Sequence, residues 1–478
     1  MGEAVDGRQG RVIGTRKGSA GHAVSVTINR GGAEVLPVQE QGLVSVSRQV
    51  VRAAAQGLGS LAVLALAGCG NNYRPVVSAI NPVGPSSQPT VYATALADPG
   101  NGNNALVTVV DVFGDTVTAT AAVNPAPTYL LTDTSGQSYV LHSGTPLIDT
   151  FTSAAGLMTS LVRQSSLDAT ACVTGKATCL GQATANTTSG PLFITEPAVN
   201  KVAVFTAGTP PTIRQELPVA PNPIYTIANG SASRAYVLSQ GATPGTSQGT
   251  ATAVEAGTAA NNAISATIPV GINPVYGIMN SDARRAFVLN NGSGTVTAIN
   301  TQGNSVDKTI TVGTNPVWAD VSTSTNEIAV LNQGANGANG SVSVINIALC
   351  NPTAVTGNVT CDPNNPVDAA TFGTVLGTIP VGRGAVQVAV LAGANKAYVA
   401  NATDGTVTVV DMTTMVATKT INVGGRLNWI QAVAGAPTGK ILVTAADTQV
   451  LTIIRTDTDA VSTTVNLQGF GVSVRVAQ

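Results

Sequence analysis

Five aromatic side chains recur at one position of a repeated sequence pattern. They are Tyr129, Tyr225, Tyr276, Trp318 and Trp429. The first four follow a proline by two residues, and Gln387 takes the corresponding place in a further copy. Aromatic residues make up only 4% of the chain, and their flat apolar faces bind sugars and apolar peptides well. This position is therefore the candidate ligand-binding site, unless each ring instead packs between neighbouring repeats as part of the core.

Asp320 and Gln387 are expected to add polar contacts to this site. From Cys69 onward the chain has one histidine, His142, which we expect in a loop or on the surface of a repeat. The chain has no glycine-rich phosphate loop and no pair of acids at a fixed spacing. The sequence thus predicts no catalytic residue, no metal site and no cofactor.

Short polar side chains recur where the third apolar run of a repeat ends. They are Asp111, Asn300, Asn346 and Asp411. A ring of oxygen ligands for calcium would explain them. Asp and Asn side chains also accept hydrogen bonds from nearby backbone N–H groups and so fix turns, and this is the interpretation that we prefer.

An export signal precedes the repeats. Arg48 and Arg52 come before the apolar run Ala53–Ala67, whose length of about 15 residues is short of the roughly 20 that a membrane-spanning helix needs. The following Leu66-Ala67-Gly68-Cys69 resembles the lipobox of bacterial lipoproteins. That resemblance implies cleavage before Cys69 and a lipid on its thiol. Gly70 stands where an Asp often marks inner-membrane retention, which favours the outer membrane.

The segment before this signal is unusual, because export signals normally begin at the N-terminus. Two explanations stay open. Translation starts near Leu43–Val46 and the first residues are not made, or the chain carries a long cytoplasmic extension, which would put the lipobox in doubt.

Four further cysteines follow Cys69. They are Cys172, Cys179, Cys350 and Cys361. An even number fits disulfides formed in an oxidising compartment, and four cysteines allow three pairings. The short spacings favour Cys172–Cys179 and Cys350–Cys361. No CxxC motif and no neighbouring histidine accompany them, so a zinc site is not expected.

Composition and repetition both predict an all-β fold. Charged residues are only 10% of the chain, and Val, Thr, Gly and Asn suit short strands joined by many turns. The segments Ile272–Gly313 and Arg383–Gly424 repeat one order of four β-rich runs over about 42 residues. A four-stranded unit of this size cannot bury both of its faces alone, so copies must stack, and a closed ring of copies is a β-propeller.

The repeat resembles a known family. Lys396–Asn401 (KAYVAN) followed by Thr406–Asp411 (TVTVVD) is similar to the YVTN-family β-propeller repeat of secreted and surface proteins of bacteria and archaea. In that repeat the tyrosine and valines are core residues of the second strand, so the resemblance implies a fold and not an activity.

The spacing of strand ends predicts eight four-stranded antiparallel blades, with seven as the alternative because the second and third units are degenerate. Phe470–Val476 is expected to supply the inner strand that the first unit lacks and thereby to close the ring. The predicted organisation is an N-terminal extension and signal peptide over residues 1–68, a linker over 69–88 and a single propeller over 89–478.

These features predict an exported, lipid-anchored propeller of the cell envelope that binds or scaffolds and does not catalyse. We expect a monomer that contacts the membrane through its anchor and an envelope protein, peptide or glycan through the propeller. Nucleic acid is not expected, because the chain has no basic run among aromatics. The alternatives are an enzyme resembling the propeller lactonases and a structural or adhesive surface protein.

Overall fold

The computed structural model describes residues 91–133, 136–153, 159–166, 180–181, 183–184, 191–228, 233–257, 261–348, 371–435 and 438–476. The chain divides into the units Met1–Pro75 and Val76–Gln478. The first unit lies outside the described residues, and so do all five cysteines, so the lipid and disulfide predictions stay predictions. Across the described part of the chain, no helix is both long and apolar enough to span a membrane.

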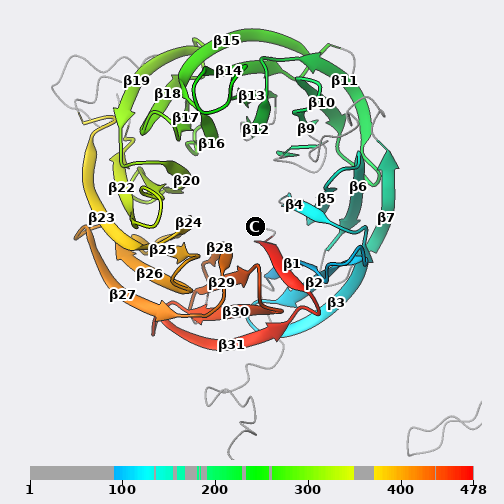
Figure 1. The fold of residues 1–478 in the computed structure, drawn as a ribbon, viewed down its shortest axis with the longest axis vertical. Coiled ribbons are helices and arrows are strands. Elements are labelled where there is room, and N and C mark those ends of the chain that lie inside the picture. The colour runs from blue at the N-terminus through cyan, green and yellow to red at the C-terminus, as the bar shows by residue number, and fades with distance from the viewer. Residues whose placement is uncertain are drawn as a thin grey trace, which may run out of the picture. The chain divides into compact units, whose positions relative to one another are not determined.

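The second unit folds into eight four-stranded antiparallel sheets arranged as the blades of a propeller (Figure 1). The innermost strands are β32 (Phe470–Val476), β4 (Pro127–Thr132), β8 (Ala183–Thr184), β12 (Pro223–Ala228), β16 (Pro274–Met279), β20 (Pro316–Ser322), β24 (Ala385–Leu391) and β28 (Leu427–Val433), in blades 1 to 8. The second strands are β1 (Tyr92–Asp98), β5 (Gln137–His142), β9 (Pro191–Glu196), β13 (Arg234–Ser239), β17 (Arg285–Asn290), β21 (Glu327–Asn332), β25 (Lys396–Asn401) and β29 (Lys440–Ala445). The third strands are β2 (Ala105–Asp111), β6 (Leu147–Thr152), β10 (Lys201–Thr206), β14 (Gln248–Glu255), β18 (Thr295–Asn300), β22 (Asn339–Asn346), β26 (Thr406–Asp411) and β30 (Val450–Arg455). The outermost strands are β3 (Thr116–Val123), β7 (Thr159–Ser166), β11 (Thr212–Pro218), β15 (Ala263–Ile272), β19 (Ser305–Thr311), β23 (Val375–Arg383), β27 (Val416–Asn422) and β31 (Ala460–Asn466).

Burial within a blade follows the position of each strand. The second strand β25 (KAYVAN) is buried at five of its six residues, because both faces of its sheet pack against neighbouring blades. The outermost strand β27 (VATKTIN) is exposed at all but one residue, and it carries threonine, lysine and asparagine. Continuous apolar runs therefore mark the middle strands, which is the pattern that the sequence shows.

Blade 1 joins the two ends of the described chain. β32 pairs antiparallel with β1, from Ala93 opposite Val476 to Asp98 opposite Phe470. The eight-blade count and the closing C-terminal strand are both confirmed, and the seven-blade alternative is wrong. Closure removes the free inner edge that β1 would otherwise present.

The recurring Asp and Asn residues fix turns, as predicted. Asp411 Oδ1 accepts hydrogen bonds from the backbone N–H groups of Thr413 and Thr414 at 2.8 and 3.0 Å. Asp111 accepts from Phe113 and Gly114 in the same way, at 3.0 and 3.1 Å. These carboxylates hold the turn between the third and fourth strands of their blades.

Each repeat tyrosine also links its blade to the next. Tyr398 is fully buried in blade 7, and its hydroxyl donates to Asp459 Oδ1 in the β30–β31 turn of blade 8 at 2.6 Å. Lys396 Nζ binds the other oxygen of Asp459 at 3.0 Å. Tyr236 in blade 4 repeats the contact, donating to Asn304 Oδ1 in blade 5 at 2.7 Å. The tyrosine of the repeat is therefore both a core residue and a hydrogen-bond donor to the next blade.

Removing the Tyr398 hydroxyl is expected to weaken the contact between blades 7 and 8. Tyr398→Phe keeps the buried ring but takes a donor from a carboxylate, so the free energy of unfolding should fall by about 1.5–3 kcal/mol. Tyr236→Phe is the matched control, because its acceptor is a neutral amide and the expected loss is about 0.5–1.5 kcal/mol. Urea unfolding followed by circular dichroism measures both values. Equal losses in the two variants would contradict the role of the Asp459 charge.

Candidate functional site

The aromatic position lies at the start of the innermost strands, where the chain enters each blade. Asn222, Asn273 and Asn315 precede the prolines with φ of 56°, 53° and 53°, a left-handed conformation that Asn adopts more readily than most residues. The strand register then shifts by one residue after the proline, for example between Pro316 and Trp318. The same shift recurs beside each of the other four aromatics, and such bulges change the direction of the side chain that follows.

The aromatic rings meet one another in a chain of contacts. Tyr225 and Tyr276 have centroids 4.8 Å apart, and Tyr276 stacks on Trp318 at 4.0 Å with an interplanar angle of 21°. Trp318 meets Trp429 edge to face at 5.4 Å. Trp318 belongs to blade 6 and Trp429 to blade 8, so these two rings meet past the inner strand of blade 7. The structure thus brings four of the five predicted aromatics together near the propeller axis.

Arg475 connects the fifth aromatic to this chain. Its guanidinium carbon lies 4.3 Å from the Trp429 ring centroid and 5.4 Å from that of Tyr129. Its Nη2 donates to the Tyr129 hydroxyl and its Nε to the carbonyl of Leu130, both at 3.1 Å. Such cation–π contacts stabilise by roughly 0.5–2 kcal/mol. We call Tyr129, Tyr225, Tyr276, Trp318, Trp429, Asp320 and Arg475 the axial cluster.

Sequence reasoning missed Arg475, although a signal was present. In register, Arg475 of β32 takes the place that Asp320 has in β20, two residues after the position of the aromatic. Ser473 stands at the aromatic position of β32. Aligning the closing strand with the other innermost strands would have placed Arg475 beside the predicted site.

Asp320 ties two blades together and remains partly exposed. Its Oδ1 accepts from the N–H of Val321 at 2.9 Å, and its Oδ2 accepts from the N–H of Val390 in blade 7 at 2.7 Å. Burial raises the pKa of Asp320 more than these two hydrogen bonds lower it, to about 6. The carboxylate is therefore charged at neutral pH and becomes protonated in mild acid.

Gln387 has a different environment from the aromatics that it replaces. It is only 4% exposed, and its Oε1 accepts from the backbone N–H of Ile430 in blade 8 at 3.0 Å. This hydrogen bond joins the inner strands β24 and β28, so the contact that the structure gives Gln387 is one between blades.

The tyrosines of the cluster are more buried than its tryptophans. Tyr129, Tyr225 and Tyr276 are 6%, 9% and 9% exposed, which favours a packing role for their rings. Trp318 and Trp429 are partly exposed and so retain surface for a ligand. Burial raises the pKa of Tyr276 above its ordinary range, with Asp320 raising it further and Arg475 lowering it. The Tyr276 hydroxyl is therefore neutral and lies in the field of both charges.

His142 is not a loop or surface residue, contrary to the prediction. It ends β5, is 1% exposed, and its Nε2 lies 3.2 Å from Asp149 Oδ2 while its Nδ1 lies 3.0 Å from the carbonyl of Pro125. At the same two positions of blade 7, Asn401 Nδ2 donates to Thr408 Oγ1 at 2.9 Å. The His142–Asp149 pair thus takes the place of a buried polar pair of the repeat.

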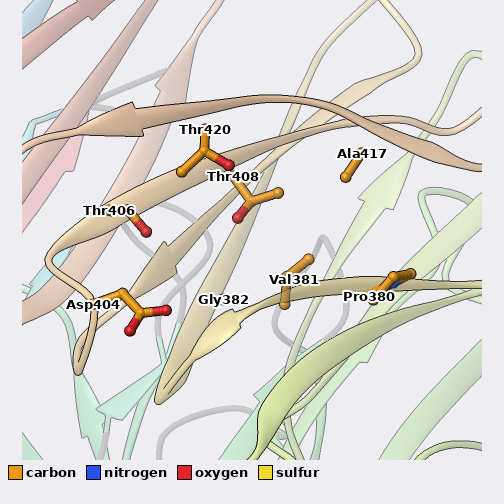
Figure 2. Close-up of a pocket in the computed structure, with 8 residues that line it drawn as sticks. All are labelled: Pro380, Val381, Gly382, Asp404, Thr406, Thr408, Ala417 and Thr420. Atoms are coloured by element: carbon orange, nitrogen blue, oxygen red, sulfur yellow. The ribbon is translucent and has the colours of Figure 1, made fainter.

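A shallow groove of about 310 Å³ lies between blades 6 and 7 (Figure 2). It is lined by Pro380, Val381, Gly382, Asp404, Thr406, Thr408, Ala417 and Thr420. Its one charged side chain, Asp404, accepts hydrogen bonds from the backbone N–H and the Nε of Arg383, both at 2.7 Å, and these lower its pKa. The groove thus lies at the junction of blades 6 and 7, and its one carboxylate is already bound by Arg383. In the described ranges no three His, Cys, Asp or Glu side chains gather as a metal site would require.

Solved structures share the propeller fold with this chain. Apo AztD from Citrobacter koseri is 13% identical with a TM-score of 0.53, over 81% of this chain and 98% of that chain. Dihydro-heme d1 dehydrogenase NirN, solved in complex with DHE, is 10% identical with a TM-score of 0.53, over 81% and 75% of the two chains. A functionally unknown protein from Desulfotomaculum acetoxidans is 12% identical with a TM-score of 0.50, over 72% and 99%. At these identities the likeness shows the fold alone.

Sequence comparisons add no family. No protein-family model matches the chain. No curated protein matches it either. The resemblance to the YVTN repeat therefore rests on the repeat residues themselves.

Proposed function

We propose that this chain is a YVTN-type propeller of the cell envelope, anchored by a lipid on Cys69, that binds a ligand or partner without catalysis. The axial cluster is the proposed binding site. The anchor is supported by the Leu66-Ala67-Gly68-Cys69 motif after a short apolar run, and Gly70 favours the outer membrane. An envelope protein, a peptide or a glycan is the expected partner of a monomeric propeller.

One observation carries the binding proposal. Trp318 and Trp429 are partly exposed in a cluster that also holds Asp320 and Arg475. Partly exposed indole rings beside charged groups are typical of small-molecule sites, where apolar surface gives affinity and a few polar groups give orientation. A structural or adhesive role is the second candidate, because the tyrosines of the cluster are nearly buried. The lactonase-like alternative has no observation in its favour.

The tryptophans provide the test of binding. The chain has only two, Trp318 and Trp429, and both belong to the axial cluster. Titration of the full chain with a panel of glycans, short peptides and amino acids is expected to give a saturable change in tryptophan emission with at least one class. Arg475→Gln should weaken that change, whereas Asp457→Asn in an exposed turn should not. A panel that leaves both emission and melting temperature unchanged would support the structural role instead.

The anchor is tested separately by the mass of the membrane-extracted protein. We expect a chain that begins at Cys69 and carries a lipid, and a Cys69→Ala variant that is released from the membrane. A soluble, unprocessed chain that retains Met1 would overturn the lipoprotein assignment without affecting the fold.

A further inference from the structure

The axial cluster contains two opposite charges that have no ionic partner of their own. Among the ion pairs of the described residues, none includes Arg475 or Asp320. The contacts of Arg475 go to a carbonyl, a hydroxyl and two aromatic rings. Those of Asp320 go to two backbone N–H groups. Charges at a partly buried place normally pair, so both groups are available to a charged ligand.

Both groups keep hydrogen-bonding capacity for such a ligand. A guanidinium has five N–H donors, and Nε and one N–H of Nη2 are engaged in Arg475. Each carboxylate oxygen of Asp320 accepts one hydrogen bond and has a further lone pair. The indole Nε1–H of Trp429 is buried, and no acceptor among the described residues binds it. The cluster thus offers unused donors around Arg475 and unused acceptors at Asp320.

Ring contacts link the two charges. The Arg475 guanidinium lies 4.3 Å from the Trp429 ring centroid, and Trp429 meets Trp318, which stands two residues before Asp320 in β20. Asp320 and Arg475 also shift the pKa of the Tyr276 hydroxyl, in opposite directions. The partly exposed rings of Trp318 and Trp429, 5.4 Å apart, belong to the same cluster. A ligand that satisfies the whole cluster therefore carries one negative end, one positive end and an apolar body.

We propose that the axial cluster binds a small zwitterion with an apolar side chain, an α-amino acid or a short peptide, with its carboxylate at Arg475 and its ammonium at Asp320. A neutral glycan stacks on the indoles but satisfies neither charge. A simple anion leaves Asp320 uncompensated, and a simple cation leaves Arg475 uncompensated. Because opposite charges across an interface give selectivity, the zwitterion is favoured over all three. This inference rests on the proposed binding function of the cluster.

Four probes that share one aromatic ring separate the two charged contacts. L-phenylalanine carries both charges, phenethylamine only the ammonium, 3-phenylpropanoate only the carboxylate, and N-acetyl-L-phenylalanine amide neither. Their dissociation constants for the full chain are measured by tryptophan emission and by calorimetry. L-phenylalanine is expected to bind about tenfold more tightly than either singly charged probe, because each charge-assisted contact contributes about one such factor. The uncharged amide is expected to bind most weakly.

Two variants assign the ends of the ligand. Asp320→Asn should weaken the binding of L-phenylalanine and phenethylamine about tenfold and leave that of 3-phenylpropanoate unchanged. Arg475→Gln should weaken the binding of L-phenylalanine and 3-phenylpropanoate about tenfold and leave that of phenethylamine unchanged. Arg475→Lys keeps the charge and should restore carboxylate binding in part, which also covers the case in which Arg475→Gln does not fold. Asp457→Asn is the control variant, because it removes a carboxylate from an exposed turn of blade 8.

The pH dependence gives an independent readout. An ammonium binds the ionised form of Asp320, and the Tyr276 hydroxyl beside it is neutral throughout this range. Phenethylamine affinity should therefore fall as the pH drops through about 6, where Asp320 takes up its proton. Asp320→Asn should remove this dependence.

The outcomes separate the two levels of the proposal. Equal binding of all four probes, or equal effects of both variants on all probes, overturns zwitterion recognition. If glycans change the tryptophan emission and the four probes do not, the binding function stands and the ligand class is wrong. If no compound changes it, both proposals are wrong.

Discussion

Replacing His142 with alanine is expected to lower the free energy of unfolding by about 3 kcal/mol, since it removes a buried ring and a hydrogen-bond partner of the buried Asp149 side chain. His142 and Asp149 are 1% and 0% exposed, with Nε2 and Oδ2 3.2 Å apart. Both ring nitrogens lie within hydrogen-bonding distance of oxygen atoms, those of Pro125 and Asp149. His142→Ala removes both contacts and leaves a cavity beside Asp149. Chemical denaturation at neutral pH measures the loss.

A double variant tests whether the loss comes from the broken polar pair. His142→Asn with Asp149→Thr rebuilds the pair that Asn401 and Thr408 form in blade 7. We expect this variant to recover most of the stability, because replacing both partners of a buried hydrogen bond can be nearly neutral. A double variant as unstable as His142→Ala would show that blade 2 requires the size of the imidazole and not the polar pair.

The same pair gives a defined acid sensitivity. Burial alone would raise the pKa of Asp149, but hydrogen bonds from His142 and from the backbone and side chain of Asn124 lower it below its ordinary value. A lowered carboxylate pKa contributes stability above the unfolded value of about 3.9, and this contribution is lost as the pH falls through the folded value. The stability of the wild type should therefore drop more steeply below pH 4 than that of the double variant.

Deleting residues 470–478 is expected to abolish cooperative unfolding of the propeller, the largest effect that we predict. The deletion removes β32 from blade 1, including the fully buried Val474, and exposes the inner edge of β1. It also removes Arg475, whose guanidinium contacts both the Tyr129 ring and the Trp429 ring. A domain is stable by only about 5–15 kcal/mol, so the loss of a complete strand consumes most of that margin.

Calorimetry of the deletion variant and of two point variants tests this prediction. Val474→Ala removes buried methyl groups from the same strand and should lower stability by about 1–3 kcal/mol. Phe470→Ala is the control, because Phe470 is 40% exposed and its loss should change stability by less than about 0.5 kcal/mol. A deletion variant that melts cooperatively near the wild-type temperature would mean that blade 1 is stable with three strands.

The fold was predictable because its signals are local and repeated. The clearest units combine apolar middle strands with an Asp or Asn that fixes a turn, as Thr406–Asp411 and the turn after it show. The closing strand was predictable because Phe470–Val476 is a β run without partners in its own unit. Repetition thus supplied the blade count without any knowledge of distant contacts.

The details of the site depend on contacts that repetition does not encode. Arg475 reaches Tyr129, which lies 346 residues away in the sequence, and only the register of β32 on β1 places it there. Trp318 meets Trp429 across blade 7, a contact set by the geometry of the closed ring. His142 looked like a surface residue because it is polar at the end of a strand, and its buried partner Asp149 stands on the next strand.

The pairing of β32 with β1 also determines when the molecule can be completed. Ala93 lies opposite Val476, so blade 1 cannot form all four strands until β32 has been synthesised. Contacts of such high sequence separation slow folding, because the entropy of closing the chain must be lost before they form. A partly made chain therefore cannot close its ring, and the export that we propose would favour a chain that stays open until it has crossed the membrane whole.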